Sequence, residues 1–118
     1  MNTSLLLITF LFTKHFVVDF PLQGPFQYKN KGTYGHVGGV LHASLHGLAT
    51  MLCFWWYAPL ACVWLGLADA VAHYHIDWVK QQLNRGLSYA DRMWWVWLGA
   101  DQAAHYLTYV GIIYVVAS

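Results

Sequence analysis

The sequence predicts an all-α protein with one domain, residues 1–118, in which a four-transmembrane-helix bundle surrounds a His/Asp-rich site. Two observations predict this fold. Apolar residues make up 58% of the chain and charged residues only 9%, a balance typical of integral membrane proteins. The apolar residues also fall into four runs, and each run approaches or exceeds the roughly 20 residues that cross a hydrocarbon core.

The first two runs enclose the longest polar stretch of the chain. Residues 4–20 form the first run, and Pro21 supports a stop directly after it, because proline cannot continue a helix. A polar, glycine-rich loop is expected over residues 23–36. The second run, residues 38–57, ends in aromatic residues, which suit the interface between membrane and water.

The third and fourth runs are joined by a short connection. Residues 59–84 are long enough to cross a membrane and project beyond it. Residues 84–91 are turn-rich, and Ser88 or Asp91 could cap the helix that follows. The fourth run covers residues 92–117. The chain is thus expected to cross the membrane four times.

Basic residues set the expected orientation. Lys29 and Lys31 lie in the first loop, and Lys80, Arg85 and Arg92 surround the third connection. Cytoplasmic loops of membrane proteins carry an excess of lysine and arginine. We therefore expect a multi-pass inner-membrane protein with both of these loops in the cytoplasm and both termini on the other side. A net charge near zero argues against nucleic acid as a partner.

Each run carries histidine or aspartate side chains one helical turn apart. Residues four positions apart lie on the same face of a helix, so each set forms a polar stripe. The chain has no glutamate, and four of its five aspartates belong to these stripes. In the expected topology all the stripes lie in the cytoplasmic half of the bundle, where they would converge. The nine residues are His15, Asp19, His42, His46, Asp69, His73, Asp77, Asp101 and His105.

These nine residues predict a metal centre. Four-helix bundles build such centres from inward-facing carboxylates and imidazoles at one-turn spacing. Ionised carboxylates inside a membrane are costly, and about two divalent cations would neutralise the four in the stripes. Nitrogen and oxygen ligands suit zinc, manganese or iron. We therefore expect two divalent ions, zinc foremost, with some of the nine residues orienting the ligands rather than binding metal.

A centre with two metal ions is typical of hydrolases. Such ions make water more acidic and hold phosphoryl or acyl oxygens, while a spare carboxylate moves protons. The predicted function is metal-dependent hydrolysis of a membrane lipid or lipid-linked phosphate or ester from the cytoplasmic side. Asp77 and Asp101 are the candidate catalytic residues. The candidate contacts to substrate or water are Gln23, Lys29, Lys31 and Gln102.

Other functions stay open at this point. The same polar groups could form a relay in a transporter or channel for metal ions or protons. The outer halves of the four runs are almost wholly apolar, which counts against a route through one protomer but not against one between subunits of a homo-oligomer. A haem-binding bundle fits less well, because four buried carboxylates would lie beside the iron. A metal-free, hydrogen-bonded or ion-paired core is the remaining alternative.

The two cysteines, Cys53 and Cys62, lie on either side of the turn that joins the second and third runs. They do not form a zinc motif. Apolar packing is the favoured role, because a disulfide would require an oxidising compartment.

At the residues of the stripes the chain resembles a family of small, uncharacterised integral-membrane proteins from bacteria and phages, a domain of unknown function. The resemblance covers nearly the whole chain and rests on four segments. The family itself implies no established activity. The segments are His15-Phe-Val-Val-Asp19-Phe-Pro-Leu-Gln23, His42-x3-His46, Asp69-x3-His73-Tyr-x-Ile-Asp77 and Asp101-Gln102-x2-His105.

The set is similar, more loosely, to inner-membrane proteins regarded as metal-dependent hydrolases. His15-x3-Asp19 followed by Pro-Leu also looks like part of the motif of helical zinc phosphoesterases of the phospholipase C and nuclease type. In those enzymes a histidine stands where this chain has Gln23, and the substrate enters a soluble cleft. The resemblance therefore implies a metal site, and Gln23 is the position at which this chain departs from the motif of those enzymes.

Overall fold

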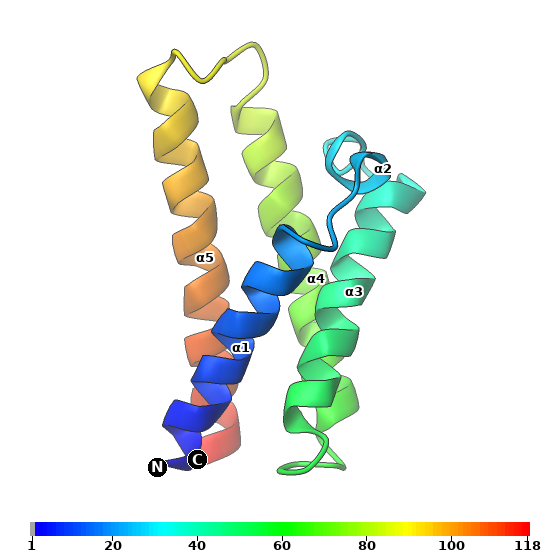
Figure 1. Ribbon diagram of the computed structural model, residues 1–118, viewed down its shortest axis with the longest axis vertical. Helices are drawn as coiled ribbons and strands as arrows, with labels where there is room; N and C mark the ends of the chain where they lie inside the picture. Colours follow the sequence, from blue (N-terminus) through cyan, green and yellow to red (C-terminus); the bar gives the residue numbers. More distant parts are fainter. Residues whose placement is uncertain (1) are drawn as a thin grey trace.

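The fold is all-helical. A computed structural model describes residues 2–118, and no strand occurs within them (Figure 1). The prediction of an all-α fold is therefore confirmed, and each of the four predicted runs forms one long helix. The helices are α1 (Thr3–Asp19), α2 (Pro25–Tyr28), α3 (Val37–Phe54), α4 (Cys62–Leu83) and α5 (Arg92–Ala117).

Polar side chains cap two of the four long helices, α1 and α3. Asn2 caps α1 by accepting a hydrogen bond from a backbone N–H of the first turn. His36 caps α3, because its Nδ1 accepts from Gly38 N at 3.0 Å. Asp91 precedes α5 without capping it. Its carboxylate instead closes the preceding turn by accepting from Ser88 N at 2.7 Å.

The stretch expected to be an irregular loop, residues 23–36, contains the short helix α2. Pro25 stands at the start of this helix, where the missing N–H would have no partner in any case. α2 lies against the N-terminal turn of α3 (Figure 1). Gly38 permits this approach, since a Cβ atom there would overlap the carbonyl oxygen of Phe26.

Helices α3 and α4 pack backbone to backbone. A Cβ atom on Gly47 would lie 2.7 Å from the carbonyl oxygen of Gly66, and one on Gly66 would lie 2.6 Å from the carbonyl oxygen of Gly47. Small residues at a helix crossing allow such close approach, and this is common between membrane helices. α1 packs on α3 and α5, and α5 packs on α4, so the four long helices enclose a common interior.

The apolar core lies at the end of the bundle that holds the two termini and the α3–α4 connection (Figure 1). Cys62 belongs to this core, as predicted, and neither cysteine forms a disulfide within residues 2–118. The core is small, because much of the interior is occupied by ionisable side chains. Its buried residues are Leu7, Leu11, Phe54, Cys62, Leu65, Tyr109 and Ile112.

Large apolar side chains cover the outside of the helices. Leu52, Trp64 and Leu107, on α3, α4 and α5, are 76%, 72% and 70% exposed. Soluble monomers rarely expose apolar patches beyond a few hundred Å². Among the described helices, α3 alone is long and apolar enough, by length and composition, to cross a membrane. The expectation of four membrane crossings is therefore met by one helix, and crossings by α1, α4 and α5 stay a prediction.

Candidate metal centre

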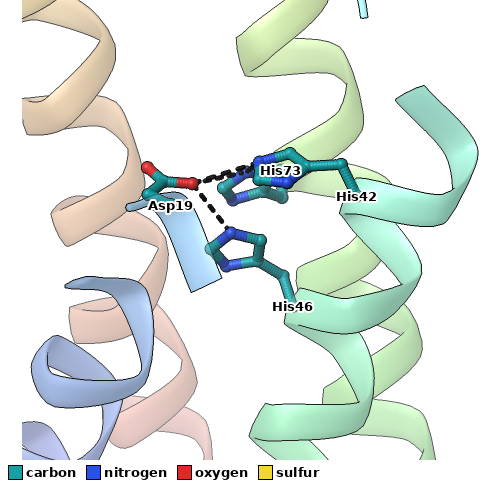
Figure 2. Close-up of side chains that lie close together, drawn as sticks. All are labelled: Asp19, His42, His46 and His73. Carbon is teal, nitrogen blue, oxygen red and sulfur yellow. Dashed lines mark hydrogen bonds and ion pairs between the residues drawn. The ribbon is translucent and has the colours of Figure 1, made fainter. Parts of the chain in front are cut away.

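Four side chains from three helices point toward one another in the interior of the bundle (Figure 2). Asp19 Oδ1, at the end of α1, lies 2.9 Å from His46 Nε2, 3.1 Å from His42 Nε2 and 3.7 Å from His73 Nε2. His42 Nε2 and His73 Nε2 are 3.1 Å apart. In a tetrahedral zinc site with bonds near 2.0 Å, neighbouring ligand atoms are about 3.3 Å apart. One divalent ion could therefore take all four of these atoms as ligands.

Spacing along α3 and the packing of α3 on α4 together bring the three imidazoles to one place. His42 and His46 share a face of α3 because they are one turn apart. The close α3–α4 crossing then brings His73 beside them, and the His46 and His73 rings stack with their centroids 3.5 Å apart. All three imidazoles are at most 1% exposed, and Asp19 is 8% exposed. The side chains are therefore held rigidly and away from water.

The hydrogen bond to His42 leaves its inner nitrogen available for metal. His42 Nδ1 lies 3.0 Å from Gln27 Oε1, which can only accept, so Nδ1 carries the proton. The lone pair of Nε2 then faces the other ligand atoms. Metal-binding histidines are generally oriented in this way by an outer partner. Gln27 belongs to α2, so this short helix has a role that the sequence analysis missed.

His15 holds Asp19 in place. His15 Nε2 lies 3.0 Å from Asp19 Oδ2 and 3.1 Å from Gln102 Oε1, and both oxygens accept its proton. Its Nδ1 therefore accepts from the Tyr109 hydroxyl at 2.7 Å. Asp19 thus uses one oxygen toward His15 and the other toward the three imidazoles of the first group. This arrangement makes His15 a positioning residue for Asp19, although its ring also lies close to those of His73 and His105.

A second group of potential ligands adjoins the first. It consists of Asp77 on α4 with Asp101 and His105 on α5. His105 Nε2 is 3.3 Å from Asp77 Oδ1 and 3.5 Å from Asp101 Oδ1. Asp77 Oδ2 also lies 3.4 Å from both His42 Nε2 and His73 Nε2. Asp77 therefore reaches both groups, as a carboxylate between two metal ions would.

A match to a known family accompanies this geometry. Residues 6–118 match the family model described as Protein of unknown function (DUF3307). The chain belongs to the DUF3307 family. For this DUF3307 member, neither the curated proteins nor the solved structures give a significant match. The resemblance to a domain of unknown function is thus confirmed, and the looser likeness to hydrolases stays a prediction.

In this DUF3307 protein Asp69 does not join either group of ligand atoms. Its Oδ2 accepts from Lys14 Nζ at 2.5 Å and from Thr50 Oγ1 at 2.6 Å. Lys14 Nζ also lies 3.2 Å from His46 Nδ1. The Lys14–Asp69 ion pair therefore contacts the outer nitrogen of His46, whereas Nε2 of the same ring lies toward Asp19. The structure therefore brings eight of the nine predicted residues together and places Asp69 in an ion pair.

A lysine near the end of a membrane helix is expected to extend toward the interface, but Lys14 is 7% exposed and paired in the interior. Its periodicity gives a signal of this burial. Leu7, Leu11 and Val18 are buried on α1, and Lys14 falls between them at helical spacing. A lysine on the buried face of a helix needs a buried partner, because an unpaired ammonium group is costly away from water. That requirement points to a carboxylate on a neighbouring helix, and here Asp69 supplies it.

The four residues predicted to meet substrate or water differ in their surroundings. Lys31 is 8% exposed and its Nζ lies 2.9 Å from Asp77 Oδ2, so its charge serves the site and is not free to meet a head group from outside. Lys29 is exposed. Gln23 donates to the backbone carbonyl of Asp19, and its buried Oε1 has no partner among the described residues. Gln102 donates to Asp101 Oδ2 at 3.0 Å.

Proposed function

We propose that this protein is a membrane-embedded, metal-dependent hydrolase that acts on a lipid or lipid-linked phosphate or ester from the cytoplasmic side. The observation that carries the proposal is the placement of Asp77 between two groups of ligand atoms, one with Asp19 and three imidazoles and one with Asp101 and His105. Paired divalent ions, zinc foremost, would supply Lewis acidity to water and to two substrate oxygens.

The distribution of side chains supports insertion in a membrane. Apolar residues face outward and ionisable residues face inward, the reverse of a soluble bundle. Basic residues gather at the end opposite the termini, near α2 and the α4–α5 connection, which favours that end as cytoplasmic. α1 has only 17 residues, and the inward polar stripes lower the mean hydropathy of α4 and α5, which is why α3 alone is both long and apolar enough. On this basis we propose four crossings of the inner membrane.

Charge balance refines the expected number of ions. Four carboxylates and the ammonium groups of Lys14 and Lys31 are buried, which leaves two formal negative charges when the histidines are neutral. One divalent ion neutralises them. A second divalent ion is balanced when a dianionic phosphate group enters the site with it. We therefore expect the second ion to bind more tightly in the presence of a phosphate group.

Asp101 is the better placed of the two candidate catalytic carboxylates. Asp77 is held by Lys31 and His105, whereas Asp101 Oδ1 is buried and accepts no hydrogen bond from residues 2–118. Gln102 fixes the other oxygen of Asp101. A carboxylate with one free oxygen beside the ligand atoms can take a proton from water as substrate is cleaved.

Zinc-loaded protein in detergent should release phosphate or alcohol from a panel of lipid phosphates and esters. Asp101→Asn should keep the zinc ion held by Asp19 and the three imidazoles, because Asp101 is not in that group, and should lose about 100-fold or more in rate, as expected for removal of a general base. Asp91→Asn is the matched control, because Asp91 lies in an exposed turn far from the interior. Equal rates for Asp101→Asn and the unmodified protein would remove Asp101 from the reaction.

The competing function is transport of metal ions or protons. A transporter needs a polar route to the non-cytoplasmic side, and there the interior of the described chain is the apolar core around Leu11, Phe54 and Tyr109. Flux assays in liposomes separate the two functions. Zinc or proton flux without hydrolysis of any lipid in the panel would contradict the hydrolase proposal.

A further inference from the structure

An apolar cleft opens between α4 and α5 beside the second group of ligands. Its volume is about 320 Å³, within the range of roughly 300–1,000 Å³ common for sites that hold small molecules. Ile76, Val79 and Trp97 contribute to its apolar walls, and Asp101 and Lys80 also line it. The cleft therefore joins an apolar surface to a member of the proposed metal centre.

Two polar groups distinguish this cleft from an ordinary gap between helices. Asp101 is 5% exposed, and its Oδ1 has no hydrogen-bond partner among the described residues. Lys80 is half-buried and forms no ion pair with any residue in the range 2–118, whereas Lys14 and Lys31 both do. An unpaired cation beside a buried carboxylate and an apolar wall favours an anionic, amphipathic occupant.

We propose that the cleft binds one hydrocarbon chain of a lipid phosphate, with the phosphate group at Lys80 and Asp101. The inference rests on the proposed function and names its substrate class. The charge of Lys80 complements the phosphate, and the phosphate offsets a second divalent ion near Asp101. The apolar walls take the chain, because exposed side chains such as Val79 and Leu83 flank the cleft on the side expected to face lipid.

The test uses the zinc-loaded protein and a phosphatidate with a photoreactive diazirine in one acyl chain. Val79→Trp should fill the cleft and reduce labelling of α4 and α5 at least tenfold. Val96→Trp is the matched control, since Val96 lies outside the cleft and the two valines are similarly exposed, 43% against 46%. Diacylglycerol with the same label should mark the cleft at least tenfold less than phosphatidate.

Lys80→Met provides a second variant that does not depend on tolerance of a large side chain. In Lys80→Met, phosphatidate and diacylglycerol should label the protein to the same extent, and the labelled residues should still be those of the cleft. Unchanged labelling in Val79→Trp, or equal labelling by the two lipids in the unmodified protein, would overturn the proposal. Inorganic phosphate that competes as well as unlabelled phosphatidate would also overturn it, because the chain would then contribute nothing.

Metal content and hydrolysis in the same samples separate this inference from the proposed function. If the zinc-containing protein is labelled in the cleft but cleaves no lipid, the lipid-binding proposal holds and the hydrolase proposal fails. If the protein hydrolyses lipid with zinc but its Val79→Trp variant is labelled as strongly as the unmodified protein, the hydrolase proposal holds and the lipid-binding proposal fails.

Discussion

Replacement of Lys14 with methionine should destabilise the protein by about 3–5 kcal/mol, the usual cost of removing one partner from a buried ion pair. Asp69 is 1% exposed, and without Lys14 its carboxylate keeps only the hydrogen bond from Thr50. The loss should be visible as a lower midpoint in denaturant or thermal unfolding of the detergent-solubilised protein. Lys29→Met serves as the control, because Lys29 is exposed and should tolerate the same change.

The double variant Lys14→Met/Asp69→Leu should recover most of the lost stability, since apolar pairs often replace buried ion pairs at little cost. It should also keep its bound metal, because Asp69 faces Lys14 and Thr50 rather than the imidazoles. Loss of metal in a double variant that stays folded would show that Asp69 is a ligand after all. Stability losses that simply add in the double variant would show that the two residues do not act as a pair.

Replacement of Asp77 with asparagine should have the largest effect on the metal centre. Asp77 contacts His105 on one side and His42 and His73 on the other, so it is the carboxylate that joins the two groups. With a non-hydrolysable phosphonate lipid present, the unmodified protein should hold about two zinc ions and the variant about one. Elemental analysis after gel filtration measures this difference.

Two comparisons make the Asp77 result specific. Asp91→Asn should leave the zinc content unchanged, because Asp91 lies outside the bundle interior. Lys31→Met should leave Asp77 free of its ammonium partner and should strengthen binding of the second ion. An Asp77→Asn protein that still holds two ions would contradict the role assigned to this carboxylate.

Much of the candidate site could be predicted from one-turn spacing. An interval of four residues places two side chains on one face of a helix in any fold, and polar stripes on otherwise apolar helices turn inward. His42 with His46, and Asp101 with His105, therefore meet the other residues in the structure. The apolar runs also predicted the four long helices, although α3 ends at Phe54 and α4 begins at Cys62, three residues short of the predicted bounds on each side of their connection.

The residues that the sequence analysis misplaced depend on contacts between distant segments. Asp69 carries the same one-turn signal as His73, but the rotation of α1 places Lys14 against it. Lys31 lies in a loop expected to be exposed, and only the docking of α2 on α3 brings it to Asp77. Spacing within one helix contains no information on ion pairs between distant segments, such as Lys14 with Asp69 and Lys31 with Asp77. The two buried lysines also halve the negative charge that the four aspartates alone would give.

The metal content of the purified protein is the most direct test of the account. Protein purified without chelator should contain at least about one equivalent of zinc, manganese or iron, as one four-ligand site requires. The variant Asp19→Ala/His73→Ala, which removes two atoms of that site, should contain none. Metal-free protein that stays folded and refuses added zinc would contradict the metal centre and leave the cluster as a polar core or proton relay.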